Sequence, residues 1–359
     1  MSHNRDAALL AAKPWQELPQ PRPFRLCCIE RIDETHNVVT FRFEAAGEPV
    51  RFCYKPGQFI TLLLDIAGEC YSRAYTLSSS PSRPYSISIT VKRVHGGQVS
   101  NYLIDNLRPG HGLDALGPAG SFNLVDIPAE KYLFLSAGCG ITPMFSMSRW
   151  LTDTRVGADI AFIHSATTQA DLIFASKLEA MANGHPGFRL GYLIEQGACP
   201  DWSHAGVLPG RLNLPALETL CSDWRERTLY VCGPEPYMAA VADMVQAAGF
   251  AMSRFHQESF GTPTAQSAPA AGTATGFMLK VGDKVHPLGE SGLLLDGIEA
   301  LKLPIIAACR SGVCGACKCQ VLEGEVLRLS EMTLSEEDKA KGMVLACSTR
   351  ALSDLSLKL

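Results

Sequence analysis

The chain has 359 residues, which is more than one hydrophobic core usually serves, so we expect two or three domains. Its 47% hydrophobic and 19% charged residues are ordinary for a soluble globular protein. The formal net charge of -4 gives no reason to expect nucleic acid or a membrane surface as a partner. The apolar run at 7–12 is too short for a secretory signal, and the apolar uncharged stretch at 132–148 is interrupted by glycine and proline. We therefore expect a cytoplasmic protein without a membrane span.

The first hundred or so residues predict a tail followed by a β domain. Residues 1–23 are polar and rich in proline, so we expect a flexible tail. Residues 24–127 contain short alternating or β-branched runs separated by Gly and Pro, for example 38–43, 59–64 and 86–91. Several short strands at this spacing are typical of an antiparallel barrel.

Residues 128–261 show a different rhythm. Buried strands are expected at 132–136, 160–164, 189–194 and 228–232, and helices after the glycine turn to about 151, near 171–181 and at 238–248. This alternation predicts a parallel sheet with crossover helices.

The C-terminal part begins with an uncharged Pro, Ala, Thr, Ser and Gly stretch at 262–275, which predicts a linker. Residues 276–359 then form a third unit, with a hairpin, a helix near 293–301, a cysteine loop and a strand near 318–322. An acidic run at 323–338 holds six acids and one base, and we expect it to help dock an acceptor protein, although a simple solvated surface explains it too.

Four of the thirteen cysteines form a metal-ligand pattern. Cys309, Cys314 and Cys317 have C-x4-C-x2-C spacing, and Cys347 follows thirty residues later, as in plant-type 2Fe-2S ferredoxins. Four thiolates must converge on two irons, so the loop has to curl tightly around the cluster. The small residues at 312, 315 and 316 leave backbone N–H groups able to approach the sulfur atoms. A structural zinc site would more often use two short pairs. The total number of cysteines is odd and the other nine are scattered along the chain, which argues against a disulfide framework. One of these nine is Cys319, which we expect to be a strand residue.

Two motifs in the β domain predict a flavin site. In RAYTLSS, residues 73–79, Arg73 can pair with a phosphate, Tyr75 can lie against the isoalloxazine and Thr76 can hydrogen-bond near N5. GGQVS, residues 96–100, makes an anion nest at a helix N-terminus that suits a pyrophosphate, so FAD is preferred over FMN. Taken alone, GGQVS would be an ordinary β-turn.

Two glycine turns predict a nicotinamide site. Gly138 and Gly140 follow a buried strand, where α/β sheets bind ligands, and Thr142 and Pro143 open the next helix. The sequence CGP, residues 232–234, repeats the strand–glycine–helix pattern at a later strand. We expect Cys232 to lie at the same edge of the sheet as Gly138–Thr142. The alternative is that this cysteine is a small buried core residue.

The residues after the second strand of this half, 164–171, include one carboxylate and no Lys or Arg. This predicts a preference for NADH over NADPH. A distant base such as Arg211 would oppose the preference if it folded over the site.

These motifs, in this order over residues 24–359, resemble the ferredoxin–NADP reductase superfamily fused to a C-terminal plant-type ferredoxin. The resemblance implies an antiparallel β-barrel flavin domain, a parallel α/β nucleotide domain and a β-grasp ferredoxin domain. HQESF, residues 256–260, resembles the segment that closes over the flavin. The flavin residues implied are Arg73, Ala74, Tyr75, Thr76, Val91, Lys92, Gly97, Val99, Ser100 and Phe260. Those implied for the nucleotide are Gly138, Gly140, Thr142, Pro143, Cys232, Gly233 and Pro234. The residues implied to shape hydride transfer are Thr76, Cys232 and Glu258.

The implied function is an NADH oxidoreductase that passes electrons through FAD and a 2Fe-2S cluster to a partner redox protein. Within the superfamily the chain most resembles the reductases of hybrid cluster proteins, in stretches such as AGCGITPMFSMSRWL and CGPEPYM. Reductases of Rieske-type oxygenases, such as glycine betaine demethylases, and of multicomponent ring hydroxylases share the same parts. A redox-sensing or assembly subunit is the alternative of another class, and a complete hydride route argues against it.

Overall fold

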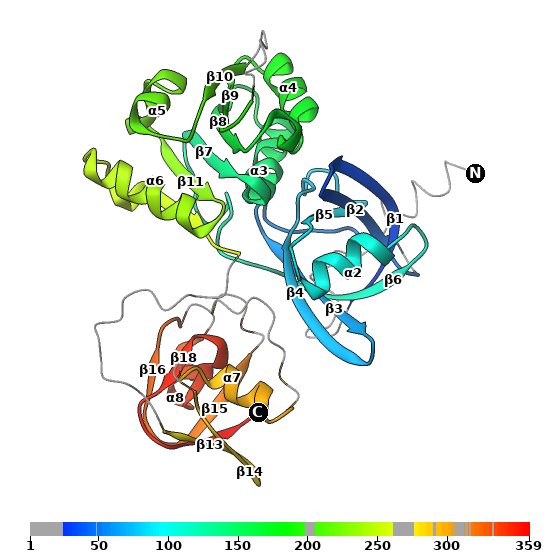
Figure 1. Ribbon diagram of the computed structural model, residues 1–359, viewed down its shortest axis with the longest axis vertical. Helices are drawn as coiled ribbons and strands as arrows, with labels where there is room; N and C mark the ends of the chain where they lie inside the picture. The colour runs from blue at the N-terminus through cyan, green and yellow to red at the C-terminus, as the bar shows by residue number, and fades with distance from the viewer. Residues whose placement is uncertain are drawn as a thin grey trace. The chain divides into compact units, whose positions relative to one another are not determined.

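The computed structural model describes residues 24–359 except 48, 198–204, 261–275, 290–291, 304, 306–311, 313–314, 316 and 332–333. The chain divides into two compact units, one comprising most of the chain up to Phe260 and the other its C-terminal part (Figure 1). The predicted tail at 1–23 and linker at 262–275 lie outside the described residues. In the part that is described, no helix is long and apolar enough to cross a membrane.

The first half of the larger unit is a six-stranded antiparallel sheet with strand order β4-β3-β6-β1-β2-β5. An isolated bridge from Leu77, just after β4, to Ile89 on β5 connects the two ends of this order, as a barrel requires. The predicted strands at 38–43, 59–64 and 86–91 all fall on strands of this sheet. The elements are β1 (Phe24–Thr35), β2 (Val38–Ala45), β3 (Phe59–Ile66), β4 (Glu69–Thr76), β5 (Ile87–Lys92), α2 (Gln98–Asn106) and β6 (Gly112–Ala119).

The second half of this unit is a six-stranded sheet of order β10-β9-β8-β7-β11-β12, with every pair parallel. Its strands are β7 (Lys131–Ala137), β8 (Asp159–Ala166), β9 (Phe188–Ile194), β10 (Ala205–Pro209), β11 (Thr228–Cys232) and β12 (Phe255–Glu258). Its helices are η2 (Gly138–Gly140), α3 (Ile141–Thr154), η3 (Gln169–Asp171), α4 (Ala175–Gly184), α5 (Leu214–Leu220), η4 (Trp224–Glu226), α6 (Glu235–Ala247) and η5 (Met252–Arg254).

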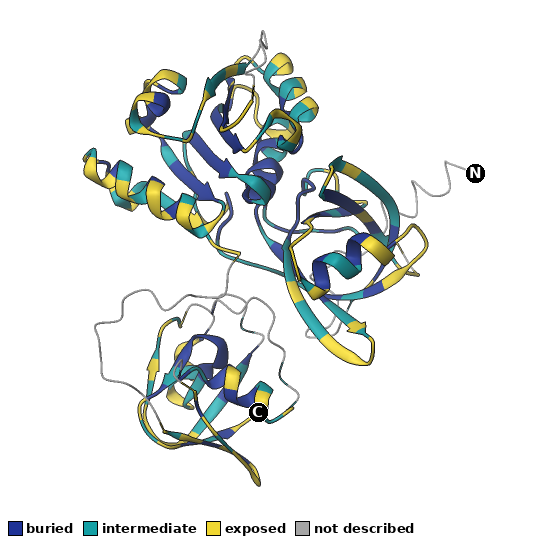
Figure 2. Cartoon of the chain, in the orientation of Figure 1, coloured by how far each residue is buried: buried dark blue, intermediate teal, exposed yellow. Residues whose placement is uncertain are grey.

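Alternate side chains of the central strands enter two different cores. Phe134 and Phe162 pack in the core that includes α3 and α4, whereas Leu133 and Leu135 pack in the core that includes α5 and α6. Because helices cover both faces, the central strands are buried along their length (Figure 2). This arrangement confirms the predicted parallel α/β domain.

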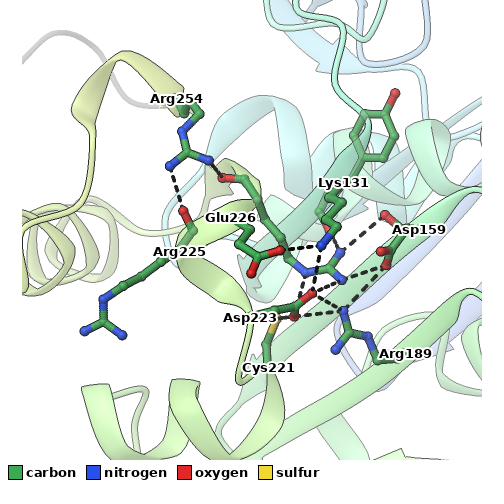
Figure 3. Close-up of polar contacts among 10 residues, drawn as sticks. Lys131, Asp159, Arg189, Cys221, Asp223, Arg225, Glu226 and Arg254 are labelled. Atoms are coloured by element: carbon green, nitrogen blue, oxygen red, sulfur yellow. Dashed lines mark hydrogen bonds and ion pairs between the residues drawn. The ribbon is translucent and has the colours of Figure 1, made fainter.

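A charged cluster joins several segments where the strands of this sheet begin. The guanidinium of Arg227, just before β11, is fully buried and contacts Asp159 at 2.7 Å and Asp223 at 2.8 Å, while also donating to the Tyr132 carbonyl at 3.0 Å. The more exposed Arg189 pairs with Asp223 at 2.9 Å (Figure 3). The cluster lies at the amino ends of the strands, opposite the edge where α/β sheets bind ligands, so it serves the fold.

The C-terminal unit holds a five-stranded mixed sheet of order β14-β13-β19-β15-β17 and a short β16–β18 ladder. Leu294, Leu295 and Ile298 of the helix α7 pack into its core. Its strands are β13 (Met278–Val281), β14 (Lys284–Pro287), β15 (Lys318–Glu323), β16 (Val326–Arg328), β17 (Met343–Leu345), β18 (Thr349–Ala351) and β19 (Leu355–Lys358). Its helices are α7 (Leu294–Ala300), α8 (Glu336–Ala340) and η6 (Ala346–Ser348).

Candidate functional site

A cavity of about 400 Å³ opens where the parallel strands end. Ala137 and Gly138 line it from the end of β7, and Ser165 and Ala166 line it from β8. It also receives Lys92 from β5, so the antiparallel half contributes one wall. The further lining residues are Asn37, Val38, Thr167, Asp171, Ile173, Glu195, Arg211, Leu212, Pro234, Pro236, Tyr237, Ala240 and Val241. This is the edge at which the sequence predicts the nicotinamide site.

At the first glycine turn, backbone atoms line the cavity because Gly138 has no side chain to cover them. Gly138 has a φ of +53°, and the nearest atom to a β-carbon placed there is Lys92 Nζ, at 4.0 Å. Gly140 is needed for a different reason, because a β-carbon at that position would overlap the Cys232 carbonyl. Thr142 is buried and donates to the Cys139 carbonyl at 3.0 Å, and the buried Pro143 follows it in the first turn of α3.

The second glycine turn lies directly against the first. Cys232 pairs in register with Ser136 of β7 on one side and with Glu258 of β12 on the other. A β-carbon at Gly233 would lie 3.2 Å from the β-carbon of Ala137, and Pro234 lines the cavity. Burial, together with the nearby carboxyl group of Glu258, raises the pKa of the Cys232 thiol, so this thiol stays protonated. The structure therefore brings Gly138, Gly140, Cys232 and Glu258 together.

The predicted flavin motif spans the end of β4. Arg73 is exposed and donates to the Ser72 carbonyl at 2.8 Å, Ala74 is half-buried and Tyr75 packs against the barrel core. The hydroxyl oxygen of Thr76 is buried and has no hydrogen-bond partner among the described residues. A buried unpaired hydroxyl costs about 1–3 kcal/mol, so the position fits a ligand that supplies a hydrogen bond.

The predicted pyrophosphate motif lies at the start of α2. Gly97 caps the helix, and a β-carbon there would lie 2.7 Å from Ser100 Oγ. The Ser100 hydroxyl accepts a hydrogen bond from the Val94 backbone at 3.2 Å, and Val99 and Ser100 are buried. Peptide N–H groups of the first turn, more than the serine hydroxyl, are therefore what this turn offers to an anion.

The remaining predicted flavin residues lie at the ends of two strands. Val91 is buried in the barrel core, next to the exposed Lys92 that ends β5. Phe260 follows β12 and is 51% exposed.

Hydrogen bonds and an ion pair join the two halves of the larger unit. Ser146 of α3 donates to the Ser79 carbonyl at 2.6 Å, and both residues are buried. The Arg83 guanidinium makes a bidentate ion pair with Asp153, with Nε 3.0 Å from Oδ2 and Nη2 2.8 Å from Oδ1. The helix that follows the first glycine turn is therefore tied directly to the barrel.

The cluster loop is described in part. Cys309 and Cys314 lie outside the described residues, but Cys317 and Cys347 are buried with their sulfur atoms 3.2 Å apart. The Gly312 backbone N–H donates to Cys347 Sγ at 3.2 Å, and the φ of +75° at this glycine suits no other residue as well. Two converging sulfurs and an N–H aimed at one of them fit a pair of thiolate ligands. Cys319 lies on β15, where burial raises its pKa to about 12, in agreement with the predicted strand residue.

The carboxylate that the sequence places at the nucleotide site is already engaged. Asp171 Oδ2 accepts from the Thr168 backbone at 3.1 Å and from the Thr168 hydroxyl at 2.7 Å, which caps η3. Arg211, the distant base, does line the cavity, where it contacts Glu195 at 3.0 Å. Sequence reasoning missed Glu195 and Tyr237, although Tyr237 lies in the CGPEPYM stretch.

The acidic run at 323–338 is more balanced than its sequence indicates. Lysines from outside the run pair with its acids, and the contacts are Lys339 to Glu336 at 2.9 Å, Lys341 to Glu337 at 2.6 Å and Lys318 to Asp338 at 2.7 Å. The surface therefore attracts a basic partner less than the count of six acids implies.

Three families match this chain in the order of its structural units. Residues 25–124 match the family described as oxidoreductase FAD-binding domain, residues 134–243 match oxidoreductase NAD-binding domain, and residues 286–352 match 2Fe-2S iron-sulfur cluster binding domain. The cofactors expected from the sequence, FAD, NADH and a 2Fe-2S cluster, agree with these matches.

Named relatives match nearly the whole chain. The glycine betaine monooxygenase reductase subunit of Pseudomonas aeruginosa is 42% identical over 353 residues, covering 91% of this chain and 93% of that protein. NADH oxidoreductase HCR of Escherichia coli is 35% identical, covering 85% of this chain and 88% of that protein. The structure of phthalate dioxygenase reductase, at 21% identity, superposes with a TM-score of 0.59 and covers 94% of this chain and 98% of that one, which shows a shared fold. The chain therefore belongs to the family of ferredoxin reductase-type oxidoreductases that combine FAD-binding and NAD-binding domains with a 2Fe-2S domain.

Proposed function

We propose that this oxidoreductase is the reductase component of an oxygenase system and delivers electrons from NADH to the oxygenase of a glycine betaine monooxygenase type. The support is the 42% identity to such a reductase subunit over almost its full length. The sequence motifs ranked a hybrid cluster protein first as acceptor, and the 35% identity to NADH oxidoreductase HCR keeps it as the second candidate. A sensing subunit has no use for a built nucleotide cavity, and we place the reaction in the cytoplasm.

The observation that carries the reductase function is the cavity shared by the two halves of the larger unit. Lys92 at the end of a barrel strand and Gly138 at the end of a parallel strand line the same space. In the proposed division, residues 24–127 bind flavin, 128–261 bind nucleotide and 276–359 hold the cluster. A nucleotide that lies along the parallel strand ends then reaches the wall formed by the flavin half.

Each predicted site residue has a part in this proposal. Bound FAD accepts a hydride and the 2Fe-2S cluster carries single electrons, so the pair converts two-electron into one-electron transfer. In the barrel, Arg73 pairs with a phosphate, Tyr75 covers the ring and Thr76 offers its buried hydroxyl. The residues proposed to complete the flavin site are Ala74, Val91, Lys92, Gly97, Val99, Ser100 and Phe260.

On the nucleotide side, Gly138 and Gly140 let the backbone approach the ligand, and Thr142 and Pro143 start the helix behind it. Gly233 and Pro234, in the second glycine turn, border the nucleotide site on the side opposite Gly138. The neutral thiol of Cys232 and the carboxyl group of Glu258 bound the space for hydride transfer. Cys309, Cys314, Cys317 and Cys347 are the proposed iron ligands.

The test is electron delivery to purified acceptors under anaerobic conditions. The protein reduced with NADH is mixed in turn with a glycine betaine monooxygenase-type oxygenase and with a hybrid cluster protein, and acceptor reduction is followed by stopped-flow absorbance. We expect fast reduction of the oxygenase and slow reduction of the hybrid cluster protein. The opposite order would make the hybrid cluster protein the acceptor, and reduction of neither would contradict both assignments.

A further inference from the structure

The turn between β1 and β2 belongs to the flavin half, but it lies at the nucleotide cavity. Asn37, in this turn, and Val38, the first residue of β2, both line the cavity. Val38 pairs in register with Lys92, and the Asn37 carbonyl accepts a hydrogen bond from the Arg93 backbone N–H at 2.8 Å. Lys92 is the other barrel residue in the lining. The position of the turn therefore determines where the barrel wall of the cavity stands.

A buried ion pair anchors this turn to the nucleotide half. Glu34, at the end of β1, lies with its Oε1 2.6 Å from Lys177 Nζ on α4, and the glutamate side chain is only 6% exposed. Lys177 Nζ also lies 4.9 Å from the centroid of the Phe174 ring, which stacks on Phe145 of α3 at 4.0 Å. The ammonium group is thus held between a carboxylate of the barrel and an aromatic pair in the core of the nucleotide half.

A second contact of the turn with the nucleotide half is longer and more exposed. His36 Nδ1 lies 3.7 Å from Asp171 Oδ1, and the histidine side chain is 67% exposed. Because solvent weakens the attraction between exposed groups, the pair of Glu34 and Lys177 is the stronger anchor. The two halves do not depend on this pair for their connection, since hydrogen bonds and an ion pair at α3 also join them. What the pair adds is the local position of the turn.

We propose that Glu34 is a positioning residue for nucleotide binding, because its ion pair with Lys177 holds the β1–β2 turn, and with it Lys92, against the cavity. The proposal rests on the proposed assignment of this cavity to the nucleotide. Without a charge at position 34, α4 no longer attracts the turn, so ordering the cavity wall costs part of the binding free energy. Hydride transfer from a bound nucleotide is unaffected, since Glu34 itself does not line the cavity.

Two variants remove the ion pair from its two sides. Glu34→Gln keeps the shape of the side chain without its charge, and the half-exposed Lys177 then remains solvated. Lys177→Gln removes the cation instead, whereas Lys177→Arg retains an ion pair and should behave as the parent. Glu30→Gln is the matched control, because Glu30 lies on the same strand and pairs with Arg42 at 3.0 Å but is absent from the cavity lining.

The readouts, in the full-length protein with FAD and cluster bound, are the dissociation constant for NAD⁺ by calorimetry, and kcat and KM for NADH with ferricyanide. We expect Glu34→Gln and Lys177→Gln each to raise the dissociation constant and KM about fivefold, with kcat and flavin content as in the parent. The double variant should bind NAD⁺ no more weakly than either single variant, because both changes remove the same interaction.

A parental dissociation constant in Glu34→Gln would overturn the proposal, as would an equal rise in Glu30→Gln or additive effects in the double variant. Loss of flavin or of kcat in both single variants would also overturn it, because the pair would then support the barrel as a whole. If the loaded parent protein neither bound NAD⁺ nor oxidised NADH, the proposed function would fail. An active parent with unmoved constants in Glu34→Gln would contradict only the role of Glu34.

Discussion

Gly140 packs so closely on Cys232 that a β-carbon at position 140 would overlap the carbonyl group of Cys232. Gly140 lies in the turn after β7, and Cys232 is the last residue of β11. Their contact therefore fixes the position of one glycine turn relative to the other at the edge of the cavity. No small adjustment of a flexible side chain can relieve the overlap, because the obstacle is backbone.

We therefore expect Gly140→Ala to displace the rim and to lower kcat/KM for NADH by at least about tenfold, since errors of an ångström in positioning are costly in catalysis. The measurement is ferricyanide reduction at varied NADH. Gly184→Ala, at the end of α4 where a β-carbon meets nothing within 4 Å, is the control and should behave as the parent. A Gly140→Ala protein with parental kinetics would show that the rim is not part of the site.

Removing one of the proposed cluster ligands should separate the two parts of the electron route. Cys347→Ser takes away the sulfur that lies 3.2 Å from Cys317 Sγ and receives the Gly312 N–H. We expect iron and acid-labile sulfide to be lost, ferricyanide reduction by NADH to persist and reduction of cytochrome c to collapse, because the nucleotide cavity belongs to the other compact unit.

Cys319→Ala is the matched control for that variant, since Cys319 is buried on β15, two residues from the proposed ligand Cys317. It should keep its iron. Loss of ferricyanide activity together with the cluster would contradict the modular route.

The charged cluster at the amino ends of the parallel strands should matter for stability and not for turnover. Arg227→Met leaves the carboxylates of Asp159 and Asp223 without this cation and the Tyr132 carbonyl without this donor. We therefore expect the free energy of unfolding to fall by about 3 kcal/mol. Arg189→Met, which removes a half-exposed member of the same cluster, should cost about 1 kcal/mol or less. Urea unfolding followed by circular dichroism compares the two, and equal losses would refute the role assigned to burial.

A buried histidine predicts how stability depends on pH. His164 is fully buried and shares a 2.8 Å hydrogen bond with Ser136, and burial lowers its pKa from 6.5 to about 4. The folded protein therefore keeps this ring neutral while the unfolded chain protonates it, so stability is complete above about pH 6.5 and declines as the pH falls toward 4.

Between pH 7 and pH 5 this single group should account for about 2 kcal/mol of the loss. His164→Asn removes the titrating ring and serves as the comparison. Its unfolding free energy should fall less steeply over that interval than the parent's, and identical slopes would rule out His164 as the source.

The sequence predicted best what depends on local composition. The strand at 228–232 coincides with β11, because helices cover both faces and every position favours apolar or β-branched residues. The edge strands β10 and β12 were not predicted, since a short edge strand such as FHQE carries no distinctive pattern.

Partnerships between side chains were beyond the sequence. Nothing in the sequence around Asp171 reveals that Thr168 occupies its carboxylate, and Glu195 and Arg211 meet only because β9 and the segment after β10 end side by side. The lysines that offset the acids of α8 lie at 318, 339 and 341, outside the run whose charge was counted.

The bond from Ser146 to the Ser79 carbonyl has a thermodynamic consequence. It joins the helix behind the first glycine turn to the segment that continues the flavin motif, so a ligand that rigidifies either one also rigidifies the other. Coupling of this kind is reciprocal. Flavin retention and nucleotide affinity should therefore rise and fall together, and a preparation that has shed its flavin will also bind nucleotide weakly.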